Sequence, residues 1–157
     1  MIMKMFALAA CAAVLVAVPA AAAPVDDAVA TVTTTLDKFN GGDVAAFIAA
    51  HRDGAVIIDE FAPFAWGGSG SVQAWLDSYG KDAAAHKISD GRVDYGKPLQ
   101  ANSDGTSAYI VLPTVYRFKQ DGKPMAGKST MTFVMVKTGK EWKISSWSYA
   151  GATAVPE

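Results

Sequence analysis

The chain has 157 residues, with 14 lysines and arginines against 15 aspartates and glutamates, so its formal net charge is −1. This balance disfavours nucleic-acid binding, because neutralising phosphates needs clustered cations and the lysines here stand singly in predicted turns. The two histidines lack an H-x-x-x-H or similar spacing, and the single cysteine, Cys11, lies near the N-terminus. We therefore predict no metal site and no cofactor.

The first 22 residues have the pattern of a secretory signal peptide. Lys4 precedes a nearly unbroken apolar run over residues 5–18, and three alanines ending at Ala22 supply a cleavage site. A lipid anchor on Cys11 is the less favoured alternative, because few apolar residues precede it. Cleavage after Ala22 would leave residues 23–157 as a single domain with no integral membrane segment. We therefore expect a periplasmic or secreted protein.

Two helices and a strand are predicted at the start of this domain. Apolar residues recur at helical spacing over residues 25–39, and Asp43 is suited to cap a second, short helix over residues 44–52. We expect His51 to interact with the C-terminal dipole of that second helix. A turn then leads into an apolar strand that ends at Asp59.

A third helix and a series of strands follow. The stretch Gly68–Ser71 fails the G-x-S-x-G spacing of a nucleophile elbow, so we interpret it as the N-cap of a helix whose buried stripe extends to His86. Pro113 predicts a bulge or an edge position. The predicted strands cover residues 91–100, 107–118, 124–137 and 141–149. Residues from Ala150 onward are expected to fray. The pattern predicts one α+β domain, with helices first and an antiparallel meander after them.

The order of these elements resembles the nuclear transport factor 2-like superfamily. The resemblance rests on two helices joined by Asn40-Gly41-Gly42-Asp43, a strand, a third helix, and a long sheet closing on Trp142-Lys143-Ile144. It is closest to SnoaL-like and ketosteroid isomerase-like domains and covers about residues 25–150. It implies a cone, or cystatin-like roll, in which three N-terminal helices pack on a curved antiparallel sheet around an apolar pocket. Family members include isomerases, dehydratases, cyclases and non-catalytic binders, so the fold does not determine the chemistry.

Asp59 falls where ketosteroid isomerase-like members carry their general base. A carboxylate of raised pKa beside an apolar ligand can move a proton between carbons. The resemblance also implies a tyrosine at the position of Thr35 and a protonated acid near Met131, which would stabilise an enolate oxygen. Thr35 is too short and too weak an acid, and Met131 has no proton to donate. We therefore do not expect ketosteroid isomerase chemistry by that route.

Three residues are the candidate catalytic groups. Strand alternation predicts that only one of Asp59 and Glu60 faces the pocket, and Asp59 is the candidate base. The structural alternative is a hydrogen-bonded acid that orders the following loop. Tyr116 and His86 are the candidate acids, although a helix-end histidine bonded to the backbone is the favoured interpretation of His86.

Aromatic residues are the candidate ligand contacts. They are Phe61, Phe64, Trp66, Tyr79, Tyr109 and Trp147. Aromatic side chains with polar tips provide apolar area together with a hydrogen-bonding group, which suits a planar or sterol-like ligand. The alternative for each of them is an ordinary position in the core.

Three functional hypotheses stay open at this point. The first is an exported module that holds a small apolar molecule in its cone pocket. The second is an isomerase, dehydratase or cyclase that uses Asp59 as base and Tyr116 or His86 as acid. The third is a structural or accessory domain that forms a homodimer through the open face of the sheet, around the apolar strand over residues 131–136.

Overall fold

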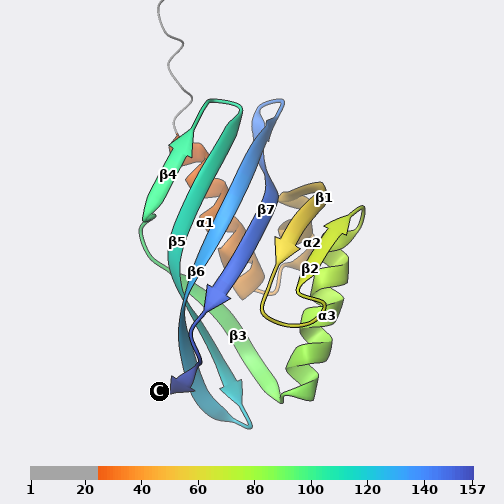
Figure 1. The fold of residues 1–157 in the computed structure, drawn as a ribbon, viewed down its shortest axis with the longest axis vertical. Helices are drawn as coiled ribbons and strands as arrows, with labels where there is room; N and C mark the ends of the chain where they lie inside the picture. Colours follow the sequence, from red (N-terminus) through yellow and green to blue (C-terminus); the bar gives the residue numbers. More distant parts are fainter. Residues whose placement is uncertain (1–24) are drawn as a thin grey trace, which may run out of the picture.

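Helices pack against a curved sheet in the computed structural model, which describes residues 25–157 (Figure 1). The described helices are α1 (Val25–Asn40), α2 (Val44–Ala49) and α3 (Ser71–Ala85). The described strands are β1 (His51–Ile58), β2 (Ala65–Gly68), β3 (Ile88–Tyr95), β4 (Gln100–Ser103), β5 (Ser107–Gln120), β6 (Lys123–Thr138), β7 (Glu141–Gly151) and β8 (Val155–Pro156). The fold is α+β, as predicted. The predicted signal peptide and its cleavage site lie outside the described residues. Within residues 25–157, no helix has both the length and the apolar character to cross a membrane.

Local signals set the helix boundaries. Asp43 caps α2 as predicted, because its carboxylate accepts a hydrogen bond from the Ala46 N–H at 3.1 Å. This helix ends at Ala49, earlier than expected, because the chain enters β1 at His51 and the Ile144 N–H donates to the Ala50 carbonyl. The N-cap of α3 lies in the predicted stretch Gly68–Ser71. It is Gly70, which has no side chain to accept a hydrogen bond.

The sheet has the strand order β2-β1-β7-β6-β5-β3, with β4 also pairing with β5 and β8 with β6. The predicted antiparallel meander is confirmed for β5, β6 and β7, and β5 and β6 pair without a register shift from Ser107 to Gln120. In contrast, β1 runs parallel to β7. This parallel pairing brings the end of β1, and with it Asp59, beside the end of β7.

The predicted strand over residues 91–100 was wrong. Residues 91–100 do not form one strand, since β3 ends at Tyr95 and β4 begins at Gln100. Pro113 lies on β5 at the point where the strand paired with β5 changes from β3 to β4. Proline has no backbone N–H, so no donor is left unpaired between those two strands. Pro113 makes no bulge toward β6, where it pairs in regular register with Thr130. The short strand β2, which was not predicted, pairs with β1.

The C-terminal segment is ordered rather than frayed. The Ala152 N–H donates to the Lys128 carbonyl at 2.8 Å, and β8 then pairs with the start of β6. The carboxylate of Glu157 forms an ion pair with Arg117. These contacts hold residues 151–154 against the open end of the cone.

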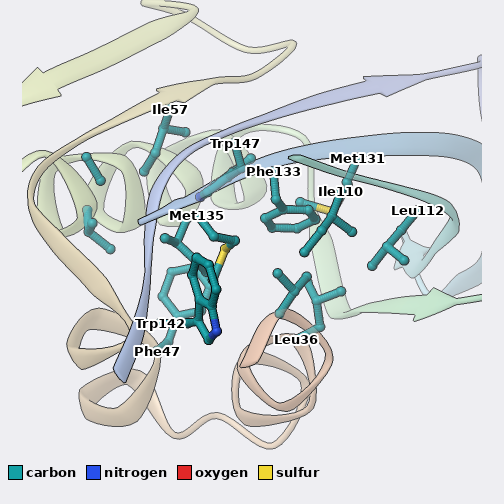
Figure 2. Close-up of a cluster of buried hydrophobic side chains, with 14 of the residues drawn as sticks. Leu36, Phe47, Ile57, Ile110, Leu112, Met131, Phe133, Met135, Trp142 and Trp147 are labelled. Carbon is teal, nitrogen blue, oxygen red and sulfur yellow. The ribbon is translucent and has the colours of Figure 1, made fainter. Parts of the chain in front are cut away.

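The hydrophobic core fills one half of the cone. Figure 2 shows buried side chains of the helices and of the sheet meeting between these two layers, among them Leu36 and Phe133. On β5 the inward residues Ile110 and Leu112 are completely buried. Further along the same strand, Tyr116 lines a cavity instead. The core therefore supports the helices at one end and leaves space at the other.

Candidate functional site

The open half of the cone contains a cavity of about 620 Å³. Most of its lining is apolar or aromatic, and the lining comes from α1, α2, α3, the sheet and the C-terminal segment. Thr35 and Met131 both line it, so the two positions at which the resemblance implies enolate-stabilising groups do lie at the cavity. The Thr35 hydroxyl donates to the Thr31 carbonyl at 2.7 Å. It is therefore engaged within α1, in agreement with the expectation that it cannot serve as a strong donor.

Asp59 follows the last residue of β1 in the sequence, and its side chain lines the cavity. One carboxylate oxygen accepts the indole N–H of Trp75 at 2.9 Å, and the other accepts the backbone N–H of Glu60 at 2.7 Å. Burial raises the pKa of Asp59 to about 6, although these two hydrogen bonds oppose the rise, and the negative charges of Glu60 and Asp82 raise it further. A carboxylate with this pKa can both hold and release a proton near neutral pH.

Glu60 lines the cavity as well, so the expectation that only one of the two acids would face it was wrong. The strand ends at Ile58, and strand alternation therefore does not extend to either acid. The chain turns here, with the Asp59 N–H donating to the Phe64 carbonyl at 3.1 Å. The Glu60 carboxylate accepts the backbone N–H of Gly151 at 2.5 Å, which fastens this turn to the end of β7.

Two tyrosine hydroxyls meet at the cavity. The hydroxyl of Tyr79 on α3 lies 2.7 Å from that of Tyr116 on β5. One hydroxyl donates to the other, which leaves one proton available for a ligand. Burial raises the pKa of both phenols, so both are neutral at physiological pH. A Cβ at Gly91 on β3 would collide with both hydroxyls, so this position must be glycine for the pair to form as it does.

His51 is buried and joins α2 to β7 through two hydrogen bonds, and the sequence did not indicate that it belongs to the site. Its Nδ1 donates to the Phe47 carbonyl at 2.8 Å, so it bonds the last turn of α2 as expected. Its Nε2 accepts the indole N–H of Trp147 at 3.1 Å, because an indole nitrogen can only donate. Burial lowers the pKa of His51 to about 4, so it is neutral at physiological pH and does not act on the helix dipole as a cation.

His86 stands at the exposed edge of the cavity. It occupies the C-cap position of α3, and its Nδ1 contacts the Asp82 carbonyl oxygen at 3.0 Å and the Asp82 carboxylate at 3.2 Å. About 60% of its side chain is exposed. This placement matches the interpretation of a helix-end histidine, and its role as an acid stays a prediction.

The structure places four of the six predicted ligand contacts at the cavity: Phe61, Phe64, Tyr79 and Trp147. The other two lie elsewhere. Trp66 is buried beside Phe61, and its indole N–H donates to the Ser78 hydroxyl at 3.2 Å. Tyr109 lies on the outer face of β5 because its neighbours Ala108 and Ile110 point inward. Contact with a ligand stays a prediction for the four that line the cavity.

Trp75 is the main residue of the candidate site that the sequence did not identify. Its helical spacing indicated only a core position, whereas its indole donates to Asp59. Its ring stacks on Tyr79 with centroids 5.4 Å apart and meets Trp147 edge-on at 5.0 Å. A hydrogen bond between residues 16 positions apart depends on how α3 docks, and no local pattern reports it.

A curved sheet wrapped around three helices with an internal cavity is the nuclear transport factor 2-like fold, and comparisons with solved structures support this assignment. An NTF-2-like protein of unknown function from Shewanella oneidensis superimposes with a TM-score of 0.58 at 18% identity, covering 81% of this chain and 98% of that chain. A ketosteroid isomerase-like protein from Erwinia carotovora atroseptica gives 0.64 at 16% identity, covering 82% and 96%. The dehydrochlorinase LinA type 3 from Novosphingobium barchaimii gives 0.69 at 10% identity, covering 84% and 88%. Identities this low show the fold alone.

The family follows from the sequence itself. The family model of the SnoaL-like domain matches residues 28–152, which is most of the chain. The chain therefore belongs to the SnoaL-like domain family. No curated protein matches it in sequence. Membership of this family does not determine the chemistry of the chain. The function therefore has to be argued from the cavity.

Proposed function

We propose that this SnoaL-like domain binds a small, mainly apolar molecule in its cone cavity. The observation that carries the proposal is the cavity of about 620 Å³, whose lining is mostly apolar and aromatic and includes a few convergent polar groups. Its volume and its lining are those of a typical small-molecule site. The Asp59 carboxylate and the Tyr79–Tyr116 hydroxyl pair are the polar groups that would orient the ligand.

A cavity-filling substitution tests this binding. We expect the uncharged fluorophore N-phenyl-1-naphthylamine to bind the wild-type chain saturably, with an increase in emission. Ala83 lines the cavity from α3, so Ala83→Trp should weaken binding at least tenfold by occupying the space. Ala84→Trp is the matched control, because Ala84 is exposed on the same helix and does not line the cavity. Equal binding by both folded variants, or no saturable binding by the wild type, would contradict the proposal.

Proton transfer is the second candidate function, and the pairing of Asp59 with two neutral phenols favours it. Asp59 has a pKa near the working range of a general base, and the Tyr79–Tyr116 pair offers a proton to an oxygen of the ligand. An isomerase, dehydratase or cyclase can use both groups, one to remove a proton and the other to donate one. Once a ligand with an acidic C–H bond is identified, wild-type protein in D₂O should exchange that hydrogen at least a hundredfold faster than Asp59→Asn protein does. Equal rates would exclude Asp59 as the base.

We also propose that the chain is exported, with residues 1–22 as a signal peptide. The support is the sequence pattern alone: Lys4, the apolar run that follows, and the alanines before Ala23. Expression of the full chain in a bacterial host should give a periplasmic protein whose intact mass corresponds to a start at Ala23. A cytoplasmic product that retains Met1 would contradict this localisation.

A further inference from the structure

The charges of the cavity wall restrict what the cavity can hold. The carboxylates of Asp59, Glu60 and Asp82 all line it, and of the described residues no lysine or arginine does. The wall also contains two histidines: His51 is neutral because burial lowers its pKa to about 4, and His86 contacts Asp82. Carboxylates therefore outnumber the basic side chains of the wall. An inference from this charge rests on the proposed function, since it concerns the ligand of the same cavity.

Two of these carboxylates have only uncharged hydrogen-bond donors. Asp59 accepts from Trp75 and from a backbone N–H, and Glu60 accepts from the backbone N–H of Gly151. Asp82 contacts His86, which is largely exposed to solvent. None of the eight ion pairs of the described residues involves Asp59 or Glu60, and the one that reaches the cavity wall joins Asp82 to His86. Asp59 is half-buried, and leaving such a carboxylate unpaired costs free energy that a cationic ligand would recover. Glu60 is exposed and adds negative charge without that cost.

The negative charge of these acids also acts on the neighbouring phenols. Burial is the main reason that the pKa of Tyr116 and of Tyr149 is raised, and the negative charge of Asp59 raises both further. Asp59 and Asp82 act on Tyr79 in the same direction. Groups on α3, β5 and β7 therefore all experience the field of these acids.

The rest of the wall suits the apolar groups that surround an organic cation. The rings of Phe61, Tyr79 and Trp147 all lie within 6.4 Å of Trp75, centroid to centroid, so aromatic rings cluster beside Asp59. The electron-rich faces of such rings attract amines and quaternary ammonium groups, and tryptophan does so most strongly. An apolar cavity with carboxylates alone would strip water from a small metal ion without replacing it, whereas an organic cation carries its own apolar surface.

We propose that the ligand of this cavity is an organic cation, an amine or a quaternary ammonium compound with an apolar body. The acidic side chains supply the charge complement and the aromatic side chains enclose the apolar substituents. An anion of the same size is rejected by the same wall, because it would face unpaired carboxylates.

Isosteric probes test this inference at pH 8, where Asp59 is ionised. Choline and 3,3-dimethyl-1-butanol have the same shape and differ by one positive charge, and benzyltrimethylammonium and phenylmethanesulfonate provide a larger cation and an anion. We expect choline to displace N-phenyl-1-naphthylamine at least tenfold more strongly than its uncharged isostere does. Benzyltrimethylammonium should displace it as well, and the sulfonate should not. Equal displacement by choline and its isostere would overturn the inference while leaving the proposed function standing. Absence of any binding of the fluorophore would instead refute the proposed function itself.

Charge-neutral variants locate the effect. The triple substitution Asp59→Asn, Glu60→Gln and Asp82→Asn keeps the side-chain shapes and should remove the preference for choline. Asp77→Asn is the matched control, because Asp77 is an exposed acid of α3 outside the cavity lining. A preference that survives the triple substitution in the folded protein would overturn the inference. The wild-type comparison of the two isosteres decides the question even if the triple variant does not fold.

Discussion

Asp59→Asn should make the protein more stable at pH 8, by about 1–2 kcal/mol, while removing its candidate base. The ordinary pKa of an aspartate here is 3.8 and burial raises that of Asp59 to about 6. This difference corresponds to a ceiling of roughly 3 kcal/mol. The amide cannot accept from both N–H donors that Asp59 binds, which takes back about 1 kcal/mol.

The sign of the pH dependence follows from the raised pKa. Between pH 3.8 and about 6 the folded state binds more protons than the unfolded state. The contribution of Asp59 to stability is therefore fully present below pH 3.8 and is lost as the pH rises through about 6. The advantage of Asp59→Asn should accordingly be largest above pH 6 and should disappear by about pH 4.

Denaturant unfolding of the two proteins from pH 4 to pH 8 measures this difference. Asp77→Asn serves as the control, since Asp77 is exposed and its carboxylate contacts only Gln73 among the described side chains. A variant that is less stable than wild type at every pH would identify Asp59 as the loop-ordering acid of the structural alternative. Stability gained by removing a charged cavity residue is typical of a position kept for function.

Features that depend on short sequence distances were predicted well. The three helices and the cap at Asp43 each depend on residues within a few positions of one another. The order of these elements also carried the family resemblance, which the family model confirms. The ends of the elements were predicted less well. The prediction assumed that strand alternation continues past Ile58, but Asp59 and Glu60 no longer belong to β1. It therefore placed only one of the two acids at the cavity, whereas both line it.

The hydrogen bonds of the site could not be predicted, because they join distant parts of the chain. Trp75 reaches Asp59 only because α3 docks beside the end of β1, and His51 reaches Trp147 across 96 positions because β1 pairs with β7. The sequence does show two histidines and four tryptophans. It does not show which of them share a cavity. Asp59 could be identified early because an acid at the end of an apolar strand is conspicuous by itself.

Trp147→Phe should cause the largest loss of stability of the substitutions considered, about 2–4 kcal/mol at pH 7. The indole N–H is the only hydrogen-bond partner of the buried His51 Nε2 among the described residues. Phenylalanine removes this donor and leaves the nitrogen unsatisfied, at a cost of about 1–3 kcal/mol. The smaller ring adds about 1 kcal/mol for lost packing against Trp75.

Trp142→Phe is the matched control for this substitution. Trp142 is as buried as Trp147, with 6% and 4% of their surfaces exposed. Its indole N–H makes no hydrogen bond within the described residues, so the same truncation there removes packing and no buried hydrogen bond. We expect Trp147→Phe to cost at least 1 kcal/mol more in urea unfolding at pH 7. Equal losses would show that the His51–Trp147 hydrogen bond contributes nothing to stability.

The pH dependence separates the lost hydrogen bond from lost packing. His51 has an ordinary pKa of 6.5 and a folded pKa of about 4, so wild-type stability should fall as the pH drops from 6.5 to 4, by up to roughly 3 kcal/mol. In Trp147→Phe no N–H points at Nε2, so that nitrogen can take a proton more readily and the folded pKa of His51 rises toward 6.5. The deficit of this variant should therefore shrink below pH 6, whereas that of Trp142→Phe should stay constant. A constant deficit for both variants would mean that Trp147 does not hold His51 in its neutral form, and that burial alone does.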